Sequence, residues 1–368
     1  MDIRRAIRRT GQVLLCAGAL AGGALLSWAT DGSGTAAASA GQFPPPMPPA
    51  EHFEAAREED EASSPPSADA ADEAPTLAAA VRTEAVPAPP AEPSPGPFGE
   101  PLREGRVITG RTPHRLILFT FDDGPDARNT PRLLDVLDDH GVHAVFFLTA
   151  NRLDGAGPWH RTNQDLAREI VARGHMVANH TVDHAQLPLL DDAGVLAQVR
   201  GADRIFERVL GQRTWLMRPP GGARSERVDA LLADRGYTQV LWNLGTGDFQ
   251  VRDAEEVFRI WRRVLERRER EHGDRGGIVL LHDTHEWSVE AVPMILGWLD
   301  DRNCELLAEG RELYDVVGDP SYFFAPRGDA SPSAEAPPAS PSERVLEARQ
   351  RALRAETRRR CGRVARLD

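Results

Sequence analysis

Short apolar runs alternate with helical patterns between residues 115 and 310. Each run is bounded by glycine, proline or polar residues, which is typical of strands buried on both faces. This alternation predicts an α/β fold with a mostly parallel sheet. The expected strands are Leu116–Phe121, Ala144–Leu148, Met176–Asn179, Trp215–Arg218, Gln239–Trp242, Gly277–Leu281 and, as the weakest, Cys304–Leu307. Seven strands indicate a barrel with one unit fewer than the usual eight.

Helix boundaries are marked between these runs. Small polar residues and proline favour the first turn of a helix, and glycine favours the position just after the last turn. The expected starts are Thr130-Pro131, Asn163, Ser225-Glu226 and Asp253, and the expected stops are Gly141, Gly174 and Gly236. In such a fold the catalytic groups gather in the loops that follow the strands.

The sequence before the folded domain differs in composition. Residues 1–40 place four arginines ahead of an apolar stretch, which predicts either a signal peptide or an uncleaved N-terminal membrane anchor. Small residues suit cleavage after Ala29 or Ala40, and the pattern does not choose between cleavage and anchoring. Residues 41–104 are rich in Pro, Ala and Glu, so we expect a disordered linker there. We therefore expect an exported protein of the periplasm, cell envelope or extracellular space, with its folded domain at residues 105–320.

A second linker and an arginine-rich tail follow the folded domain. Residues 321–342 are rich in Pro, Ser and Ala, and residues 343–368 have few apolar positions but could form a helix. Contact with nucleic acid or an anionic envelope is one interpretation of the arginines. The chain contains no lysine, however, so the arginines also fit a coding bias. We favour a solvated tail and expect no nucleic-acid partner.

Net charge and cysteine content say little about the folded domain. The formal net charge is −12 at pH 7, and much of the excess acid lies in residues 41–104. Cys16, Cys304 and Cys361 are far apart in the sequence, so they predict neither a metal site nor a disulfide framework. We expect a monomer that is stable through its own core.

The candidate chemistry begins with two adjacent carboxylates. Asp122 and Asp123 end the first apolar run, where they would repel each other unless a cation lies between them; a solvated turn is the alternative. His180 and His184 are four residues apart and could bind one cation, although surface histidines often show this spacing. One carboxylate and two imidazoles suit Zn²⁺ or a similar divalent ion and leave positions for water and substrate.

Two further motifs could complete such a site. Arg218 precedes a Pro-Pro-Gly-Gly turn whose backbone N–H groups could receive an oxyanion, or it belongs to an ordinary surface loop. His282 ends a buried strand, where it would serve as a proton donor or as a hydrogen-bonded histidine at the edge of the core.

Together these residues resemble the polysaccharide deacetylases with a NodB homology domain, also called carbohydrate esterase family 4. The resemblance covers roughly residues 105–315, and the motifs occur in the order of the family. They are Thr120 to Pro125, His180 to His184, Arg218 to Gly222, Gly247-Asp248-Phe249 and Leu281-His282-Asp283. The family fold is a distorted (β/α)7 barrel, which agrees with the predicted strand count.

The resemblance implies a role for each matching residue. A divalent metal ion, Zn²⁺ or alternatively Co²⁺, would be held by Asp123, His180 and His184. The catalytic groups would be Asp122 as general base, Arg218 as its partner, His282 as general acid and Asp248 as the residue that orients it. Contact with the substrate or the oxyanion would come from Gly221, Phe249 and Leu281.

The implied activity is the removal of N-acetyl groups from amino sugars of an acetylated envelope or extracellular polysaccharide such as peptidoglycan or chitin, with release of acetate. The sequence departs from the family at Gly221, which replaces a common aromatic residue, at Gly245, which replaces an aspartate, and at Phe249, which replaces a tryptophan. These changes affect the walls around the sugar. An O-acetyl esterase acting on xylan-type glycan and a catalytically silent glycan-binding module are the alternatives.

Overall fold

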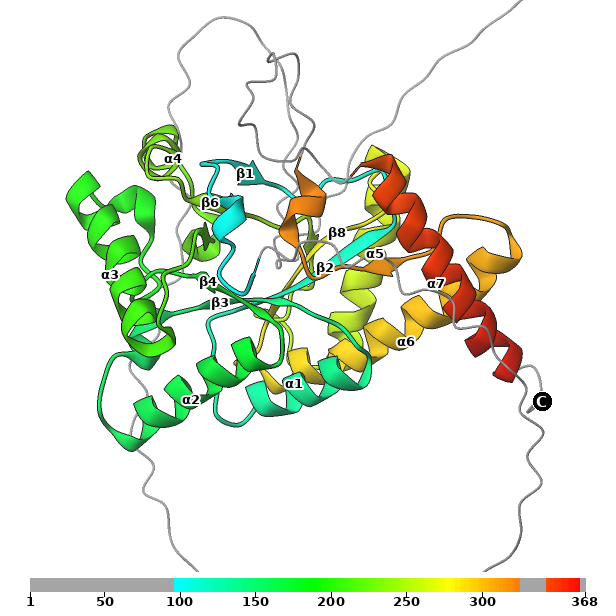
Figure 1. Cartoon of the computed structure of the whole chain (residues 1–368), viewed down its shortest axis with the longest axis horizontal. Helices are drawn as coiled ribbons and strands as arrows, with labels where there is room; N and C mark the ends of the chain where they lie inside the picture. The colour runs from blue at the N-terminus through cyan, green and yellow to red at the C-terminus, as the bar shows by residue number, and fades with distance from the viewer. Residues whose placement is uncertain (1–95, 325–341, 365–368) are drawn as a thin grey trace, which may run out of the picture. The chain divides into compact units, whose positions relative to one another are not determined.

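The computed structural model describes residues 96–324 and 342–364, and Figure 1 shows their arrangement. Within these residues the strands form one sheet in the order β1-β6-β5-β4-β3-β2-β8-β7, with β9 beside β2, and every pair is parallel. The strands are β1 (Val107–Ile108), β2 (Leu116–Asp122), β3 (Val145–Leu148), β4 (Met176–Asn179), β5 (Leu216–Met217), β6 (Thr238–Val240), β7 (Leu244–Gly245), β8 (Gly277–His282) and β9 (Asp315–Val316). The predicted α/β fold, a distorted (β/α)7 barrel, is confirmed.

Helices cover the outer face of this curved sheet (Figure 1). The helices are α1 (Thr130–Asp139), α2 (Pro158–Ala172), α3 (Asp192–Leu210), α4 (Glu226–Ala233), α5 (Ala254–His272), α6 (Glu286–Ala308) and α7 (Glu343–Val364), and α1, α2, α3, α5 and α6 contribute buried side chains to the outer cluster. The predicted caps at Ser225 and Asp253 are confirmed, because their side chains accept hydrogen bonds from the backbone N–H groups of Val228 and Glu256. The start predicted at Asn163 is wrong, since α2 begins at Pro158 and Asn163 lies inside it.

Six of the seven predicted strands overlap observed ones, namely β2, β3, β4, β5, β6 and β8. The strand expected at Cys304–Leu307 is wrong, because this segment belongs to α6. The last strand is instead β9, whose pairing with β2 depends on the fold and not on an apolar run. Strands β1 and β7, each of two residues, were not predicted.

Alternate side chains of β2 divide between two hydrophobic clusters. Ile117, Phe119 and Phe121 pack under the outer helices, whereas Leu116 and Leu118 belong to a second cluster on the inner face of the sheet. Successive side chains of a strand point to opposite faces, so Asp122 follows Leu116 and Leu118 onto the inner face. The core therefore directs the last carboxylate of β2 toward the inner face of the barrel.

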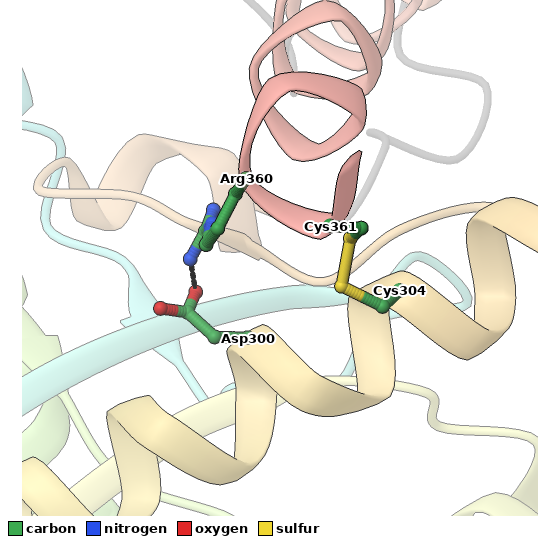
Figure 2. Close-up of a disulfide and its surroundings, with 4 residues drawn as sticks. All are labelled: Asp300, Cys304, Arg360 and Cys361. Carbon is green, nitrogen blue, oxygen red and sulfur yellow. Dashed lines mark ion pairs between the residues drawn. A yellow bond between two sulfur atoms is a disulfide. The ribbon is translucent and has the colours of Figure 1, made fainter. Parts of the chain in front are cut away.

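Helix α7 packs against the domain, which corrects one prediction and adds a bond that the sequence did not predict. A disulfide joins Cys304 of α6 to Cys361 of α7. Beside it, Arg360 forms an ion pair with Asp300 (Figure 2). The cysteine positions in the sequence did not predict this disulfide, and the interpretation of this segment as a solvated tail is wrong. No spacing within either segment could reveal the pair, because it depends on how α7 lies on α6.

Predictions for residues 1–40 and for most of both linkers fall outside the described residues. Within residues 96–324 and 342–364, no helix has the length and apolar character needed to cross a membrane.

Candidate active site

Five loops bring the predicted site residues to the carboxyl ends of the strands. Asp122 is the last residue of β2, and His180 directly follows β4. Arg218 follows β5, and His282 is the last residue of β8. Asp248 lies in the segment between β7 and α5. All five side chains are buried or largely buried, so the site is a polar cluster within an apolar frame.

Asp122 and Arg218 form a buried ion pair at the centre of the cluster. Nη1 of Arg218 donates to Oδ1 of Asp122 at 2.6 Å and to Oγ1 of Thr120 at 2.9 Å, while its Nε donates to the carbonyl oxygen of Val240 at 2.8 Å. Burial raises the pKa of Asp122, and the charge of Arg218 offsets that effect only in part. Asp122 is consequently more basic than an exposed aspartate and is held in one orientation.

Asp123, His180 and His184 converge beside this pair. Oδ1 of Asp123 lies 3.5 Å from Nε2 of His180 and 3.5 Å from Nε2 of His184. Nδ1 of His180 bonds the carbonyl oxygen of Arg218 at 2.9 Å, which leaves Nε2 facing the carboxylate. Burial lowers the pKa of His180 to about 3, so its imidazole is neutral and able to act as a ligand.

The chemistry of this donor set fits a divalent metal ion. The ligand atoms of the three residues lie within 4.8 Å of one another. Oδ1 of Asp123 is buried and accepts no hydrogen bond within the described part of the chain, an unsatisfied state that a cation would relieve. Two imidazoles and one carboxylate are also a common ligand set of catalytic zinc sites.

The backbone around these ligands adopts an uncommon conformation. Asp123, Thr181 and His184 have φ values of 73°, 69° and 62°, and within the described residues they are the only non-glycine residues with positive φ. Left-handed backbone is costly for such residues and persists only where the surrounding structure imposes it. At Thr181, a hydrogen bond from its N–H to Oδ1 of Asn179, 2.7 Å long, helps to impose it. The strain is thus concentrated at the candidate metal ligands.

His282 and Asp248 form the other side of the site. Nδ1 of His282 lies 3.0 Å from Oδ1 of Asp248, and the backbone N–H of His282 donates to Oδ2 at 2.8 Å. Burial disfavours the charged imidazole, but the hydrogen bond and charge of Asp248 outweigh it and raise the pKa of His282 to about 9. The same contacts lower the pKa of Asp248 against the opposing effect of burial. At neutral pH, His282 is therefore protonated and able to donate.

Sequence reasoning missed two contacts that hold Asp248. Oγ of Ser288 donates to Oδ2 of Asp248 at 2.6 Å, and Nε1 of Trp287 donates to its carbonyl oxygen at 2.6 Å. Both residues lie in the first turn of α6, a few positions after the His282 motif. Their proximity to that motif is the only sequence signal, and it does not reveal the direction of either side chain.

The residues predicted to contact substrate differ in accessibility. Phe249 is 63% exposed, and its ring lies edge-on to His282 with the centroids 6.3 Å apart. Gly221 occupies a tight turn at φ 62°, where an added Cβ would lie 3.3 Å from Nε2 of Gln186. Leu281 is fully buried in the core and offers no accessible surface to a substrate. Gly245 has room for a Cβ, whose nearest neighbour would be Trp242 at 3.7 Å.

Comparisons with known proteins agree with the resemblance carried by the motifs. The sequence profile of the polysaccharide deacetylase family matches residues 109–240. A chitin deacetylase of Colletotrichum lindemuthianum is 31% identical over 185 residues, which are 50% of this chain and 73% of that protein. A peptidoglycan-N-acetylglucosamine deacetylase of Bacillus cereus is 30% identical over 138 residues, which are 37% of this chain and 61% of that protein.

Two further matches complete this comparison. An uncharacterised 30.6 kDa protein of Geobacillus stearothermophilus is 30% identical over 189 residues, which are 51% of this chain and 67% of that protein. The solved structure of the Colletotrichum lindemuthianum chitin deacetylase aligns with a TM-score of 0.48 and 28% identity, over 58% of this chain and 91% of that chain. This chain spans 61 to 73% of the length of the three curated relatives.

Proposed function

Because the chain belongs to the polysaccharide deacetylase family, a family of hydrolases, we propose that it is a metal-dependent N-deacetylase of a polysaccharide. One observation carries this proposal: a buried carboxylate with an arginine partner, three residues that could hold a metal ion and a histidine bonded to an aspartate meet at one end of the sheet. A glycan-binding module would have no use for a proton acceptor and a proton donor together.

The metal ligands in this proposal are Asp123, His180 and His184. A divalent ion bound there, with Zn²⁺ favoured by the imidazoles, would act as a Lewis acid that acidifies an attacking water and polarises the acetyl carbonyl. The left-handed backbone at Asp123 and His184 directs both side chains toward this point before any ion arrives. Preorganised ligands reduce the entropic cost of binding.

Asp122 is the general base in this proposal. Its Oδ1 is bonded to Arg218, while its Oδ2 lies 3.7 Å from Nε2 of His180, on the side of the candidate metal ligands. Oδ2 is therefore the atom placed to accept the proton of the attacking water. The raised pKa favours this transfer, because a general base works best when its pKa approaches the operating pH.

His282 protonates the departing nitrogen of the amino sugar in the same proposal. Its Nδ1 is bonded to Asp248, so the donor is Nε2. The N–H of Gly221 would stabilise the oxyanion from the opposite wall. Acetate and a free amine are the products, and no covalent intermediate with the protein is required.

The substrate is proposed from the curated relatives and from the exposed wall of the site. Two of the relatives are named as deacetylases of chitin and of peptidoglycan N-acetylglucosamine, so we favour a polymer that contains N-acetylglucosamine in the envelope or outside the cell. The ring of Phe249 is exposed beside the proton donor and could pack against a sugar face. No contact in the site specifically favours O-acetyl ester hydrolysis.

The test combines metal analysis with acetate release. The full-length chain is purified, its bound metal is measured, and acetate release is followed on N-acetylglucosamine oligomers and on acetylated xylan. We expect a bound divalent ion and release from the amide substrate. Asp122→Asn should abolish release and keep the metal, whereas His180→Ala should lose both. Asp183→Asn is the matched control, because this exposed carboxylate lies between the two histidines in the sequence and should leave both readouts unchanged.

Two results would overturn parts of this proposal. A fully metal-loaded wild type that releases acetate from none of these glycans would favour the binding module. Unchanged acetate release by Asp122→Asn would exclude Asp122 as the general base, but it would not contradict the proposed metal site.

A further inference from the structure

A second group of ligand atoms lies on the acid side of the site. Asp248, His282 and His285 each offer an atom within 4.8 Å of the others. A turn sets the two imidazoles side by side, since the N–H of His285 donates to the carbonyl oxygen of His282 at 3.1 Å and the ring centroids are 5.5 Å apart. The proposed deacetylation assigns work to Asp248 and His282 but none to His285.

His285 is held in place without satisfying its own hydrogen-bonding capacity. Its ring stacks on the indole of Trp287, with centroids 4.9 Å apart and an interplanar angle of 16°. Its Nδ1 is buried and makes no hydrogen bond within the described residues. Such an unsatisfied group calls for an explanation, and a ligand that binds an imidazole nitrogen would supply one.

Asp248 retains a coordination position on the same side. Its Oδ2 receives the hydroxyl of Ser288 at 2.6 Å and the backbone N–H of His282 at 2.8 Å. Within the described residues, Oδ1 is bonded to the imidazole of His282 alone, whose Nδ1 lies 3.0 Å from Oδ1 and 3.1 Å from Oδ2. A cation could therefore replace the proton that the imidazole shares with the carboxylate, and the bonds from Ser288 and from the backbone N–H of His282 would remain.

We propose that Asp248, His282 and His285 form a second, inhibitory site for a divalent transition-metal ion such as Zn²⁺ or Co²⁺. Two imidazoles select such ions over Mg²⁺ and Ca²⁺, which prefer oxygen ligands. Zinc bonds to nitrogen and carboxylate oxygen are about 2.0–2.2 Å long, so small side-chain rotations would bring the ligand atoms into range. An ion bound at this site would prevent His282 from donating its proton and would therefore inhibit the reaction. This effect on activity rests on the proposed function.

The first test counts ions without reference to activity. The full-length protein is stripped of metal and equilibrated with Co²⁺ or Zn²⁺ over a range of free concentrations, and bound metal is measured by mass spectrometry. We expect two equivalents in the wild type, the second weaker than the first, and one equivalent in His285→Gln. His272→Gln is the control, because it removes an exposed imidazole at the end of α5 and should keep both ions.

The second test measures acetate release in the same titration. Wild-type activity should rise with the first equivalent and fall by about 100-fold or more with the second, since that is the usual contribution of a general acid. His285→Gln should keep the rise and lose the fall. Circular dichroism establishes that the His285→Gln variant is folded. Asp248→Asn is a second variant that lacks a ligand of the proposed site, and in these tests it is used only for counting bound ions.

Two outcomes would overturn the inference. One is a single bound equivalent in the wild type at all metal concentrations. The other is a second equivalent or an inhibition that persists unchanged in His285→Gln. Absence of acetate release at every metal concentration would instead contradict the proposed function, and the ion count would still decide whether the second site exists.

Discussion

Two arginine–aspartate pairs, one at the carboxyl ends of the strands and one between β9 and α7, show how differently this fold uses the same two residue types. At the active end, Arg218 and Asp122 are almost fully buried and meet at 2.6 Å. Helix α7 and its contacts with β9 and α6 are called the brace here. In the brace, Arg349 binds both oxygens of Asp315, at 2.7 and 2.9 Å, but its side chain remains 31% exposed. The first pair fixes a reactive group, whereas the second fixes a helix.

The polar groups around the two pairs differ in the same way. In the brace, Gln350 exchanges two hydrogen bonds with the backbone of Leu313, each 2.9 Å long. At the active end, Nη2 of Arg218 and Oδ1 of Asp123 are buried with no hydrogen-bond partner in the described residues. Unsatisfied buried groups cost stability unless a ligand completes them. The active end therefore has polar atoms available for a ligand, whereas the contacts of Arg349 and Gln350 in α7 are satisfied within the protein and fix the helix in place.

The largest expected effect comes from Arg218→Leu. Removing the cation leaves the buried carboxylate of Asp122 uncompensated, so the free energy of unfolding should fall by about 3–5 kcal/mol. Burial then raises the pKa of Asp122 further, the proton acceptor is lost near neutral pH, and activity should drop by about 100-fold or more. Denaturant unfolding and acetate release measure the two effects.

A second substitution separates charge from packing. In the double variant Arg218→Leu with Asp122→Asn, no uncompensated charge remains, so stability should recover in part while activity should not recover. Equal stability in the single and double variants would show that lost packing over Phe147, 4.0 Å from the guanidinium, is the main cause.

Sequence patterns predicted the strands and the residues at their ends, but they did not predict the contacts between distant segments. Strands β2, β4 and β8 were found almost to the residue, since each is a mostly apolar run, and Asp122, His180 and His282 stand at the ends of these runs. The Cys304–Cys361 pair and the Arg349 contact were invisible, because each joins segments far apart in the sequence. The contact of Ser288 with Asp248 was missed for a third reason: it depends on the angle at which α6 leaves the loop. Local chemistry was predictable, and long-range packing was not.

The disulfide should contribute to stability and not to catalysis. Replacing Cys304 and Cys361 by serine opens a loop closed over a sequence separation of 57, so the free energy of unfolding should fall by about 2–4 kcal/mol. Acetate release by the folded protein should be unchanged, because both residues lie in the α6–α7 contact and not among the site loops. Wild type treated with dithiothreitol is the matched control. Loss of bound metal in the serine variant would show that the brace and the site are coupled.

Asp248→Asn should change the pH dependence of the reaction. The proton donor must be protonated, so wild-type activity should decline as pH rises through about 9, the pKa of His282. Without the charge of Asp248, burial is the largest remaining influence on His282 and acts to lower its pKa, so the alkaline decline should move to lower pH. Activity at neutral pH should fall by about 10- to 100-fold, and pH profiles of kcat/KM measure both effects. An unmoved alkaline limb would exclude His282 as the group that titrates.

The smallest effect is expected in the brace. Arg349→Gln removes a partly exposed ion pair with Asp315, so the free energy of unfolding should fall by only about 1 kcal/mol, with no change in activity. Arg351→Gln is the matched control on the same helix, because its side chain is 69% exposed and its ion pair with Glu347, at 3.6 Å, should contribute less than about 0.5 kcal/mol. An equal loss of unfolding free energy in Arg349→Gln and Arg218→Leu would contradict this comparison. It would show that the partly exposed pair stabilises the fold as much as the buried pair does, so that burial does not explain the difference between them.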